Sequence, residues 1–296
     1  MRILLFLATN IAVVLVASVT LRLLGFERIL NESGTDLNYD SLLVFCALVG
    51  MGGSLISLML SKWMAKRGSG AVVIEQPRND VERWLVDTVA AQARAAGIGM
   101  PEVAIFNSPQ PNAFATGANR NNALVAVSTG LLQHMNKGEV EAVLGHEIGH
   151  VANGDMITLT LIQGVVNTFV MFFARIVGFF VDRVVLKNEH GLGMGYWMAT
   201  MAAEVIFGIA ASAIVMWFSR RREFRADEAG ASLSTRAQMI SALERLKAGS
   251  EMRSDLPETM TAFGINSGLR EGFKALFTSH PPLDDRIAAL RASDIA

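Results

Sequence analysis

Two histidines four residues apart, His146 and His150, stand in the stretch "AVLGHEIGHVANGD" at residues 142–155. On a helix this spacing puts both imidazoles on one face, one turn apart, where they can bind the same metal ion. Glu147 lies on the adjacent flank, where its carboxylate can take a proton from a metal-bound water without ligating the metal. The alternative is a charged helix with two surface histidines, but the chain has only five histidines in total. We therefore predict a catalytic site with one Zn²⁺ per subunit.

A catalytic zinc site needs a third protein ligand and an open position. The candidates are His190, His280, Glu223, Asp227 and Glu228. His190 falls in a loop expected on the far side of a membrane. Glu223 is favoured, because two antiparallel membrane helices that start after His150 would return the chain to the same side just before it. Asp227 lies one turn after Glu223, where a carboxylate can hold a ligand histidine by its free N–H.

Four apolar runs surround these residues and predict a polytopic membrane protein. They cover residues 3–21, 41–61, 156–174 and 197–218. Each is close to the ~20 residues that cross hydrocarbon as a helix. The first is expected to be a retained anchor, because it is longer than the apolar core of a signal peptide. The third run continues past Arg175 to Val181, and the last two runs are interrupted by Gln163, Asn167, Arg175 and Glu204. For these two runs, the alternative is a pair of long helices that are only partly embedded.

Composition and charge agree with a membrane protein that has soluble parts. The 296 residues are 51% hydrophobic and carry a formal charge of −1, which does not indicate a nucleic-acid partner. The single cysteine, Cys46, lies in an apolar run and cannot form an internal disulfide. Basic residues follow the second run at 62–67 and the fourth at 220–225, so we expect the soluble parts and both termini to face the cytoplasm.

The soluble segments predict a mainly α fold with a small β-sheet. A helix is expected after the N-cap candidate Asn79, with strands at 102–108 and 123–129 and a hairpin at 113–116 whose strand lies at the sheet edge. Further helices are expected from Lys137, at 235–247 and after the prolines of 279–291. The fold class is a membrane protein of about four transmembrane helices with a cytoplasmic zincin-like catalytic domain.

Four consecutive parts organise the chain in this interpretation. Residues 1–66 form an N-terminal transmembrane hairpin, and residues 156–219 form a second one. Residues 67–155 form a cytoplasmic segment with the sheet and the zinc helix, and residues 220–296 carry the third ligand. We expect the two helices of the second hairpin to extend directly from the helices that bear the zinc ligands.

The motifs together resemble the Ste-type/HtpX-type membrane metallopeptidases. The resemblance rests on "HEIGH" at 146–150, followed by "EFRAD" at 223–227. "SKWMAKR" at 61–67, "NAFATG" at 112–117 and "SHPPLDDRI" at 279–287 extend it over nearly the whole chain. The resemblance implies a zinc endopeptidase of the bacterial cytoplasmic membrane that cleaves misfolded or damaged membrane proteins in stress-related quality control. Self-cleavage is a further expectation.

The same resemblance implies roles for the site residues. His146, His150 and Glu223 would ligate zinc, Glu147 would be the general base, and Asp227 would support a ligand histidine. His280 and Arg286 would lie near the carbonyl under attack. The residues that bind substrate would be Asn112, Ala113, Phe114 and Ala115. An edge strand suits this role, because an unfolded peptide can add to it as a further strand with little sequence preference.

Two other classes of function stay open at this point. The first is a small transporter or channel whose zinc is structural, which the polar residues within the third and fourth runs would explain. The second is an inactive scaffold that binds substrates without cutting them.

Overall fold

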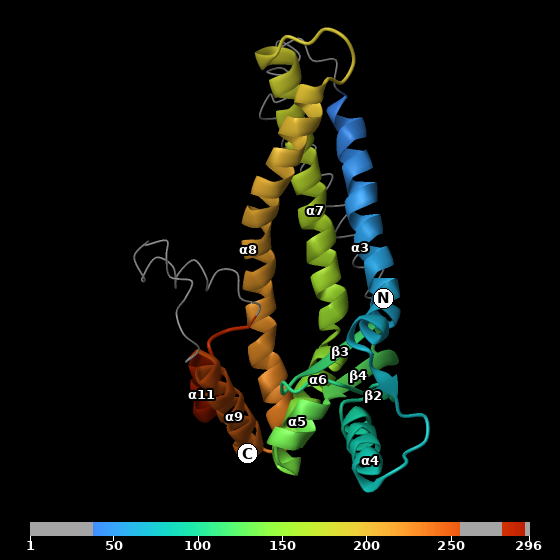
Figure 1. Cartoon of the computed structure of the whole chain (residues 1–296), viewed down its shortest axis with the longest axis vertical. Helices are drawn as coiled ribbons and strands as arrows, with labels where there is room; N and C mark the ends of the chain where they lie inside the picture. The colour runs from blue at the N-terminus through green and yellow to red at the C-terminus, as the bar shows by residue number, and fades with distance from the viewer. Residues whose placement is uncertain (1–37, 255–279, 294–296) are drawn as a thin grey trace. The chain divides into compact units, whose positions relative to one another are not determined.

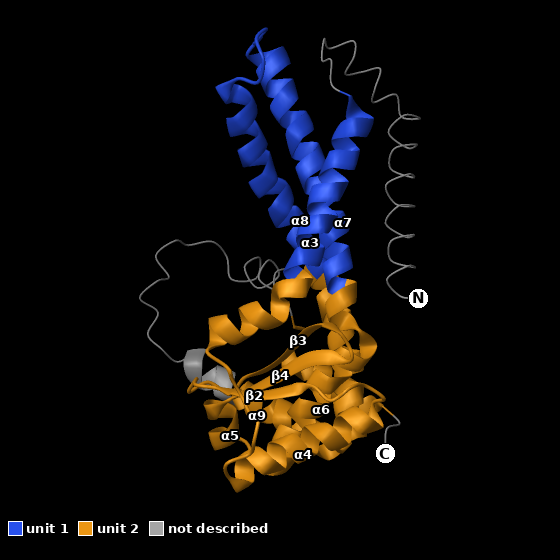
Figure 2. Ribbon diagram, turned by 90° about the vertical axis from the view of Figure 1, so that its right-hand side faces the viewer, with its two compact units in different colours: residues 1–57, 159–215 blue, residues 58–158, 216–296 orange. Residues whose placement is uncertain are grey.

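The computed structural model describes residues 38–254 and 280–293, so the first expected membrane run at 3–21 lies outside the described residues. The chain divides into two compact units, shown in Figure 2. One unit contains the described residues up to Ser57 together with Leu159–Val215. The other contains Leu58–Thr158 and the described residues from Met216 onward. The fold is mainly helical with one small mixed sheet, as the sequence predicted (Figure 1).

Three helices among the described residues are long and apolar enough to cross a membrane. They are α3 (Tyr39–Ser69), α7 (Asp155–Phe180), which continues as the π-helix η1 (Val181–Val185), and α8 (Met194–Leu233). Large apolar side chains such as Leu48 and Met201 are about 70% exposed, as expected for positions that face lipid. The second, third and fourth predicted runs are therefore present as helices.

The polar residues within these helices contact one another in the first unit. Gln163 donates to Asn167 at 2.9 Å, and Arg175 Nη1 lies 3.4 Å from Glu204 Oε1. Within η1, the buried Asp182 accepts hydrogen bonds from the backbone N–H groups of Gly193 and Tyr196. These contacts satisfy polar groups that would otherwise be costly in an apolar environment.

The sheet of the second unit has the order β1-β2-β4-β3. The strands are β1 (Val72–Val73), β2 (Glu102–Phe106), β3 (Ala113–Asn119) and β4 (Asn122–Ser128). β2 and β4 are parallel, whereas β3 pairs with β4 as an antiparallel hairpin. β3 is thus an edge strand, as the sequence predicted. The prediction missed β1 and the parallel pairing.

Five helices accompany this sheet in the described part of the second unit. They are α4 (Asp80–Ala95), α5 (Thr129–His134), α6 (Lys137–Asn153), α9 (Arg236–Ser254) and α11 (Leu283–Ala292). The predicted cap is present, since Asn79 accepts a hydrogen bond from the backbone N–H of Glu82. Leu85, Val125 and Ile148 are fully buried in a core that joins α4, the sheet and α6. This core fixes α6, the helix of the two histidines.

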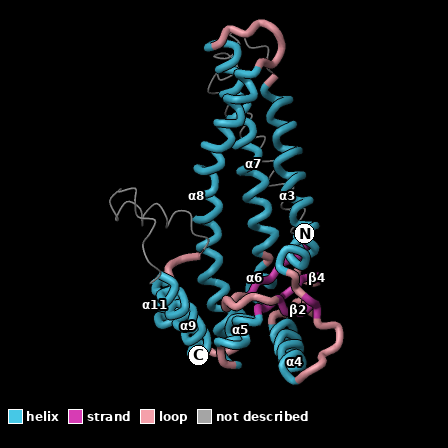
Figure 3. Tube along the Cα trace, in the orientation of Figure 1, coloured by secondary structure: helices cyan, strands magenta, loops and turns pink. Residues whose placement is uncertain are grey.

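The two ligand-bearing helices differ in how they connect to the apolar runs. α8 is drawn as one continuous helix in Figure 3. Its 40 residues include both the fourth run and Glu223. In contrast, α6 ends at Gly154, whose φ of 70° is left-handed, and α7 begins at Asp155. A left-handed glycine is the usual way to end a helix. The expectation of direct extension is therefore correct for α8 and wrong for α6.

Candidate metal centre

Three side chains from two helices converge in the second unit. His146 and His150 of α6 place their Nε2 atoms 3.1 Å apart. Glu223 of α8 lies 3.6 Å from His146 Nε2 through Oε2 and 3.4 Å from His150 Nε2 through Oε1. These three predicted ligands are thus brought together, although Glu223 lies 73 residues after His150 in the sequence (223 − 150).

The separations of the three side chains fit a tetrahedral zinc ion. Ligand atoms about 2.0–2.1 Å from zinc in tetrahedral geometry lie about 3.3 Å from one another. The observed separations of 3.1, 3.4 and 3.6 Å are close to this value. Two imidazoles and one carboxylate are also a ligand set of catalytic zinc sites, which leave a fourth position open. The residues present therefore fit the group that the sequence predicts.

Small residues allow α6 and α8 to approach closely enough for this convergence. A Cβ atom added to Gly149 would lie 2.6 Å from the Cβ of Ala229, which is far inside van der Waals contact. One turn earlier, Gly145 lies against Gly230 in the same manner. The glycines of the motif therefore set the distance between the histidine helix and the glutamate helix.

Each histidine contacts a buried carboxylate through its other ring nitrogen. His146 Nδ1 lies 2.9 Å from Asp227 Oδ1, as the prediction for Asp227 requires. His150 Nδ1 lies 2.7 Å from Asp155 Oδ2, and sequence reasoning missed this residue. The sequence could have indicated Asp155, because it is the only acidic residue between Glu147 and Asp182 and directly precedes an apolar run. Contacts of this type orient ligand imidazoles in metal sites.

His280 and Arg286 also reach the centre, but in different environments. His280 Nδ1 lies 2.6 Å from Glu223 Oε2, and its side chain is 62% exposed. Arg286 is buried and donates from Nε and Nη2 to the two oxygens of Asp227. Its Nη1 lies 3.6 Å from Glu223 Oε2. His280 is thus open to solvent, whereas Arg286 is buried against the carboxylates of Asp227 and Glu223.

Electrostatics in the centre favour positive charge at the histidines. Burial alone would lower the pKa of His150, but the carboxylates of Asp155 and Glu223 outweigh it and raise the pKa to about 9. The pKa of His146 is raised in the same way, since Asp227 and Glu223 outweigh its burial. A divalent cation would replace these protons and satisfy the same carboxylates.

The predicted base and the predicted substrate strand lie on the elements that frame the centre. Glu147 is half-buried on α6, between the two histidines in sequence. β3 packs against α6. Asn112 precedes β3 and is held by Ser128, which donates its N–H to the Asn112 carbonyl. Because the N–H of Ser128 bonds to the Asn112 carbonyl, the N–H and C=O groups of Ala113 and Ala115 point away from β4. They face the edge of β3, which has no partner strand in the part of the chain that the structure describes.

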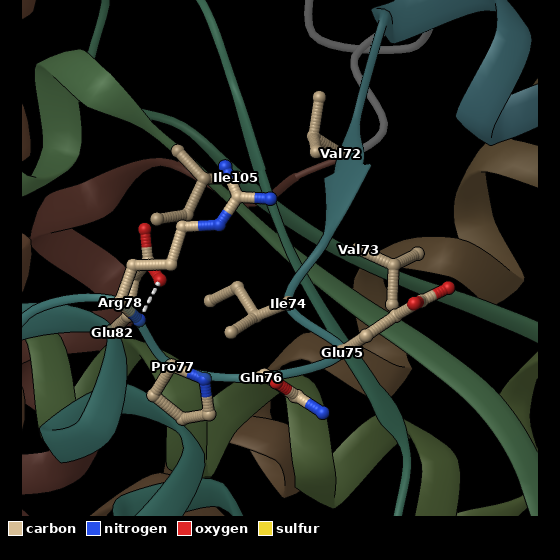
Figure 4. A pocket seen from close by; sticks show the side chains of 9 residues that line it. All are labelled: Val72, Val73, Ile74, Glu75, Gln76, Pro77, Arg78, Glu82 and Ile105. Carbon is tan, nitrogen blue, oxygen red and sulfur yellow. Dashed lines mark hydrogen bonds between the residues drawn. The ribbon is translucent and has the colours of Figure 1, made fainter.

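A hollow of about 750 Å³ lies elsewhere in this unit, beside β1 at the other edge of the sheet. Its lining comes from residues 72–78 with Glu82 and Ile105, and the backbone N–H of Arg78 donates to Glu82 (Figure 4). None of the predicted site residues lines it. The predicted site residues therefore lie outside this hollow.

The family model of peptidase family M48 matches residues 79–294, a range that includes every predicted site residue. The chain belongs to peptidase family M48. Its relatives include Protease HtpX of Thioalkalivibrio sulfidiphilus, which is 65% identical over 291 residues, or 98% of each chain. Protease HtpX of Pseudomonas putida is 63% identical and covers 98% of this chain and 99% of the relative.

A solved member of the wider fold extends this comparison. The crystal structure of S. mikatae Ste24p matches with a TM-score of 0.62 at 16% identity, over 96% of this chain and 67% of that one. At this identity the likeness concerns the fold alone. As an M48 peptidase with three candidate membrane helices, the protein is a multi-pass membrane metallopeptidase. Family membership therefore favours the enzyme over the transporter considered from the sequence.

Proposed function

We propose that this protein is a zinc-dependent endopeptidase that cleaves misfolded or damaged membrane proteins in stress-related quality control. The observation that carries the proposal is the convergence of His146, His150 and Glu223, whose ligand atoms all lie within 4.8 Å of one another. In this proposal they hold one zinc ion per subunit. The names of the relatives, Protease HtpX, support peptide-bond hydrolysis as the reaction.

Glu147 is the proposed general base. When bound, zinc lowers the pKa of water to near neutrality and polarises the carbonyl of the substrate. Glu147 takes a proton from the attacking water and delivers it to the nitrogen of the leaving amine, so that one carboxylate serves as base and then as acid. Its position beside the ligand histidines, and not among them, leaves it free for this transfer.

The surrounding residues hold and complete this machinery. Asp227 orients His146, and Arg286 neutralises the buried charge of Asp227, which gives Arg286 a positioning role in this proposal. His280 is exposed and next to Glu223, so it can donate to the oxygen that becomes negative as the peptide carbonyl is attacked. These assignments separate residues that contact substrate from residues that support ligands.

The free edge of β3 is the proposed binding site for substrate. An extended peptide would pair with the backbone groups of Ala113 and Ala115, with Asn112 and Phe114 contacting its flanks. Backbone pairing requires an unfolded segment but little sequence specificity, which suits a protease that removes misfolded proteins. The same binding mode would allow an extended segment of another copy to be cut, which is the proposed route of self-cleavage.

The proposed location is the bacterial inner membrane, with the metal centre on its cytoplasmic side. Basic residues lie in the C-terminal part of α3, at Lys62, Lys66 and Arg67, and in α8 after Phe218, at the ends of the apolar runs that precede the soluble parts. The positive-inside rule then places the soluble parts in the cytoplasm. In this arrangement residues 1–66 and 156–219 form transmembrane hairpins, and residues 67–155 and 220–296 form the catalytic segments.

The test is cleavage of a labelled, permanently unfolded protein by the full-length enzyme in detergent, with and without zinc. Glu147→Gln should keep bound zinc and lose about 10²- to 10⁴-fold in rate, because it cannot accept the proton. Glu141→Gln is the matched control, since Glu141 lies on the same helix and contacts Trp84. Cleavage by Glu147→Gln at the wild-type rate would overturn the mechanism, and no cleavage by the zinc-loaded wild type would overturn the function.

A further inference from the structure

Asp155 occupies the junction between the histidine helix and an apolar helix. It is the first residue of α7, it is 2% exposed, and its Oδ2 lies 2.7 Å from His150 Nδ1. Its backbone carbonyl accepts a hydrogen bond from Arg222 Nη1 at 3.3 Å. Arg222 directly precedes Glu223 on α8, and its Nη2 donates to Ser219 on the same helix at 3.0 Å. Asp155 is therefore tied to both helices that bear the proposed ligands.

The contact with Asp155 determines which nitrogen of His150 can bind a metal. A neutral imidazole has one N–H donor and one nitrogen with a free lone pair. A carboxylate at Nδ1 accepts the N–H there, so the lone pair is left on Nε2. His150 Nε2 is the atom that faces His146 and Glu223. Without this acceptor, the ring could rotate or adopt the tautomer that puts a proton where the metal must bind.

We propose that Asp155 is a positioning residue of the metal centre, which holds His150 in the ligating tautomer and orientation. Arg222 fixes the backbone of Asp155 to the helix of Glu223, so that all ligands keep one arrangement. The inference rests on the proposed function, because it requires a metal at these residues. It adds to Asp227 a second carboxylate, from a different helix, for the other histidine.

A purely structural role for Asp155, as a residue that only stabilises the start of α7, must be distinguished from a role in positioning His150. A carboxylate in the first turn of a helix stabilises the helix through its dipole, whatever the residue contacts. Asp80 provides the matched control, since it is the first residue of α4 and is exposed. If Asp155 acted only at the start of its helix, then Asp155→Ala and Asp80→Ala would have similar consequences for metal binding.

The experiment measures zinc affinity of the full-length, metal-free protein in detergent by competition with a chromophoric chelator. Asp155→Ala should bind zinc about 10- to 100-fold more weakly than wild type, and Asp80→Ala should match wild type. Cobalt(II) is the second probe. The visible absorption of the cobalt-loaded protein should change in Asp155→Ala, because the ligand geometry changes, and stay unchanged in Asp80→Ala.

A near-isosteric variant covers the case in which Asp155→Ala does not fold. Asp155→Asn retains an oxygen acceptor but loses the charge, so we expect a loss of about tenfold in zinc affinity, near the lower end of that range. Arg222→Gln should weaken zinc binding in the same direction, whereas Arg225→Gln, on the exposed side of the same helix, should not.

The outcomes distinguish this inference from the function on which it rests. Wild-type zinc affinity and an unchanged cobalt spectrum in both Asp155 variants would overturn the inference while the zinc peptidase stands. A wild-type protein that binds no zinc would overturn the proposed function itself.

Discussion

Arg286 and Asp227 form a buried ion pair in which Nε and Nη2 donate to the two carboxylate oxygens at 2.7 and 2.5 Å. The same carboxylate lies 2.9 Å from His146 Nδ1. α11, near the end of the described chain, is thereby linked through α8 to the helix of the motif. The candidate metal centre thus contacts a residue 140 positions after the first histidine of the motif (286 − 146).

Loss of Arg286 should destabilise the protein strongly. Arg286→Gln leaves Asp227 buried without its guanidinium partner, which is expected to cost about 3–5 kcal/mol of unfolding free energy. Arg291→Gln on the same helix is the control, because its pair with Glu244 is exposed and worth less than about 1 kcal/mol. Thermal unfolding in detergent checks both variants. Similar melting temperatures for the two would contradict the buried pair.

Replacement of His280 should affect catalysis more than metal binding. His280→Ala removes an exposed donor near Glu223, and loss of one donor to a developing oxyanion typically costs about 10²- to 10³-fold in kcat. Zinc affinity should stay within a few-fold of wild type. Rate and zinc content are measured on the same samples, with His134→Ala as an exposed control. A loss of zinc in proportion to activity would assign His280 to metal binding instead.

Proline at the free edge of β3 should impair substrate binding alone. Ala115→Pro removes an N–H that points away from β4, so the sheet keeps its own hydrogen bonds while a pairing peptide loses one. We expect KM to rise about tenfold or more. A tenfold rise corresponds to a loss of about 1.4 kcal/mol of binding free energy, roughly the contribution of one hydrogen bond. Phe114→Pro, whose N–H faces β4, should instead destabilise the fold. An unchanged KM in Ala115→Pro would argue against strand addition.

A methyl group at Gly149 should separate the two ligand helices. Because an added Cβ would lie 2.6 Å from Ala229 Cβ, α6 and α8 must move apart in Gly149→Ala. Glu223 would then move away from the histidines, and zinc affinity should fall by at least about tenfold, since even loss of a side chain that only supports a ligand costs about 10- to 100-fold. Gly68→Ala is the control, since its Cβ would meet no atom within 4 Å. Zinc titration compares the two.

Zinc affinity should rise with pH below about pH 9. The pKa of His150 in the metal-free site is about 9, so at neutral pH zinc must displace a proton from this imidazole. Raising the pH removes the competing proton, and apparent affinity should increase about tenfold per pH unit for each proton displaced, until it levels near the pKa. Chelator competition from about pH 7 to about pH 9 measures this. A flat profile would show that the histidines are already neutral.

The parts of the fold that the sequence predicted correctly depend on local patterns. Asn79 caps α4 and Lys137 begins α6, because capping and helical periodicity are properties of neighbouring residues. The carboxylate nearest the two histidines could also be predicted, since a hairpin of two apolar helices must bring Glu223 back to the side of His150. Predicting these features requires only the properties of neighbouring residues and the fact that a helical hairpin returns the chain to the side from which it started.

The features that sequence reasoning missed depend on tertiary packing. Asp155 follows a left-handed glycine, so its contact with His150 cannot be obtained by continuing the helix that carries the histidine. Arg286 could in principle face either a substrate or a carboxylate, and only the packing of α11 against the centre directs it to Asp227. The parallel pairing of β2 with β4 likewise joins strands separated by β3 in the sequence.

The long interval between the second histidine and the glutamate has a consequence for biosynthesis. A nascent chain that has emerged only as far as residue 222 carries both histidines but lacks Glu223, the proposed third ligand of the metal. The intervening apolar helices must be made and folded back before Glu223 can meet its partners. In this proposal the metal site cannot be complete, and therefore cannot cleave any peptide, before Glu223 has been synthesised.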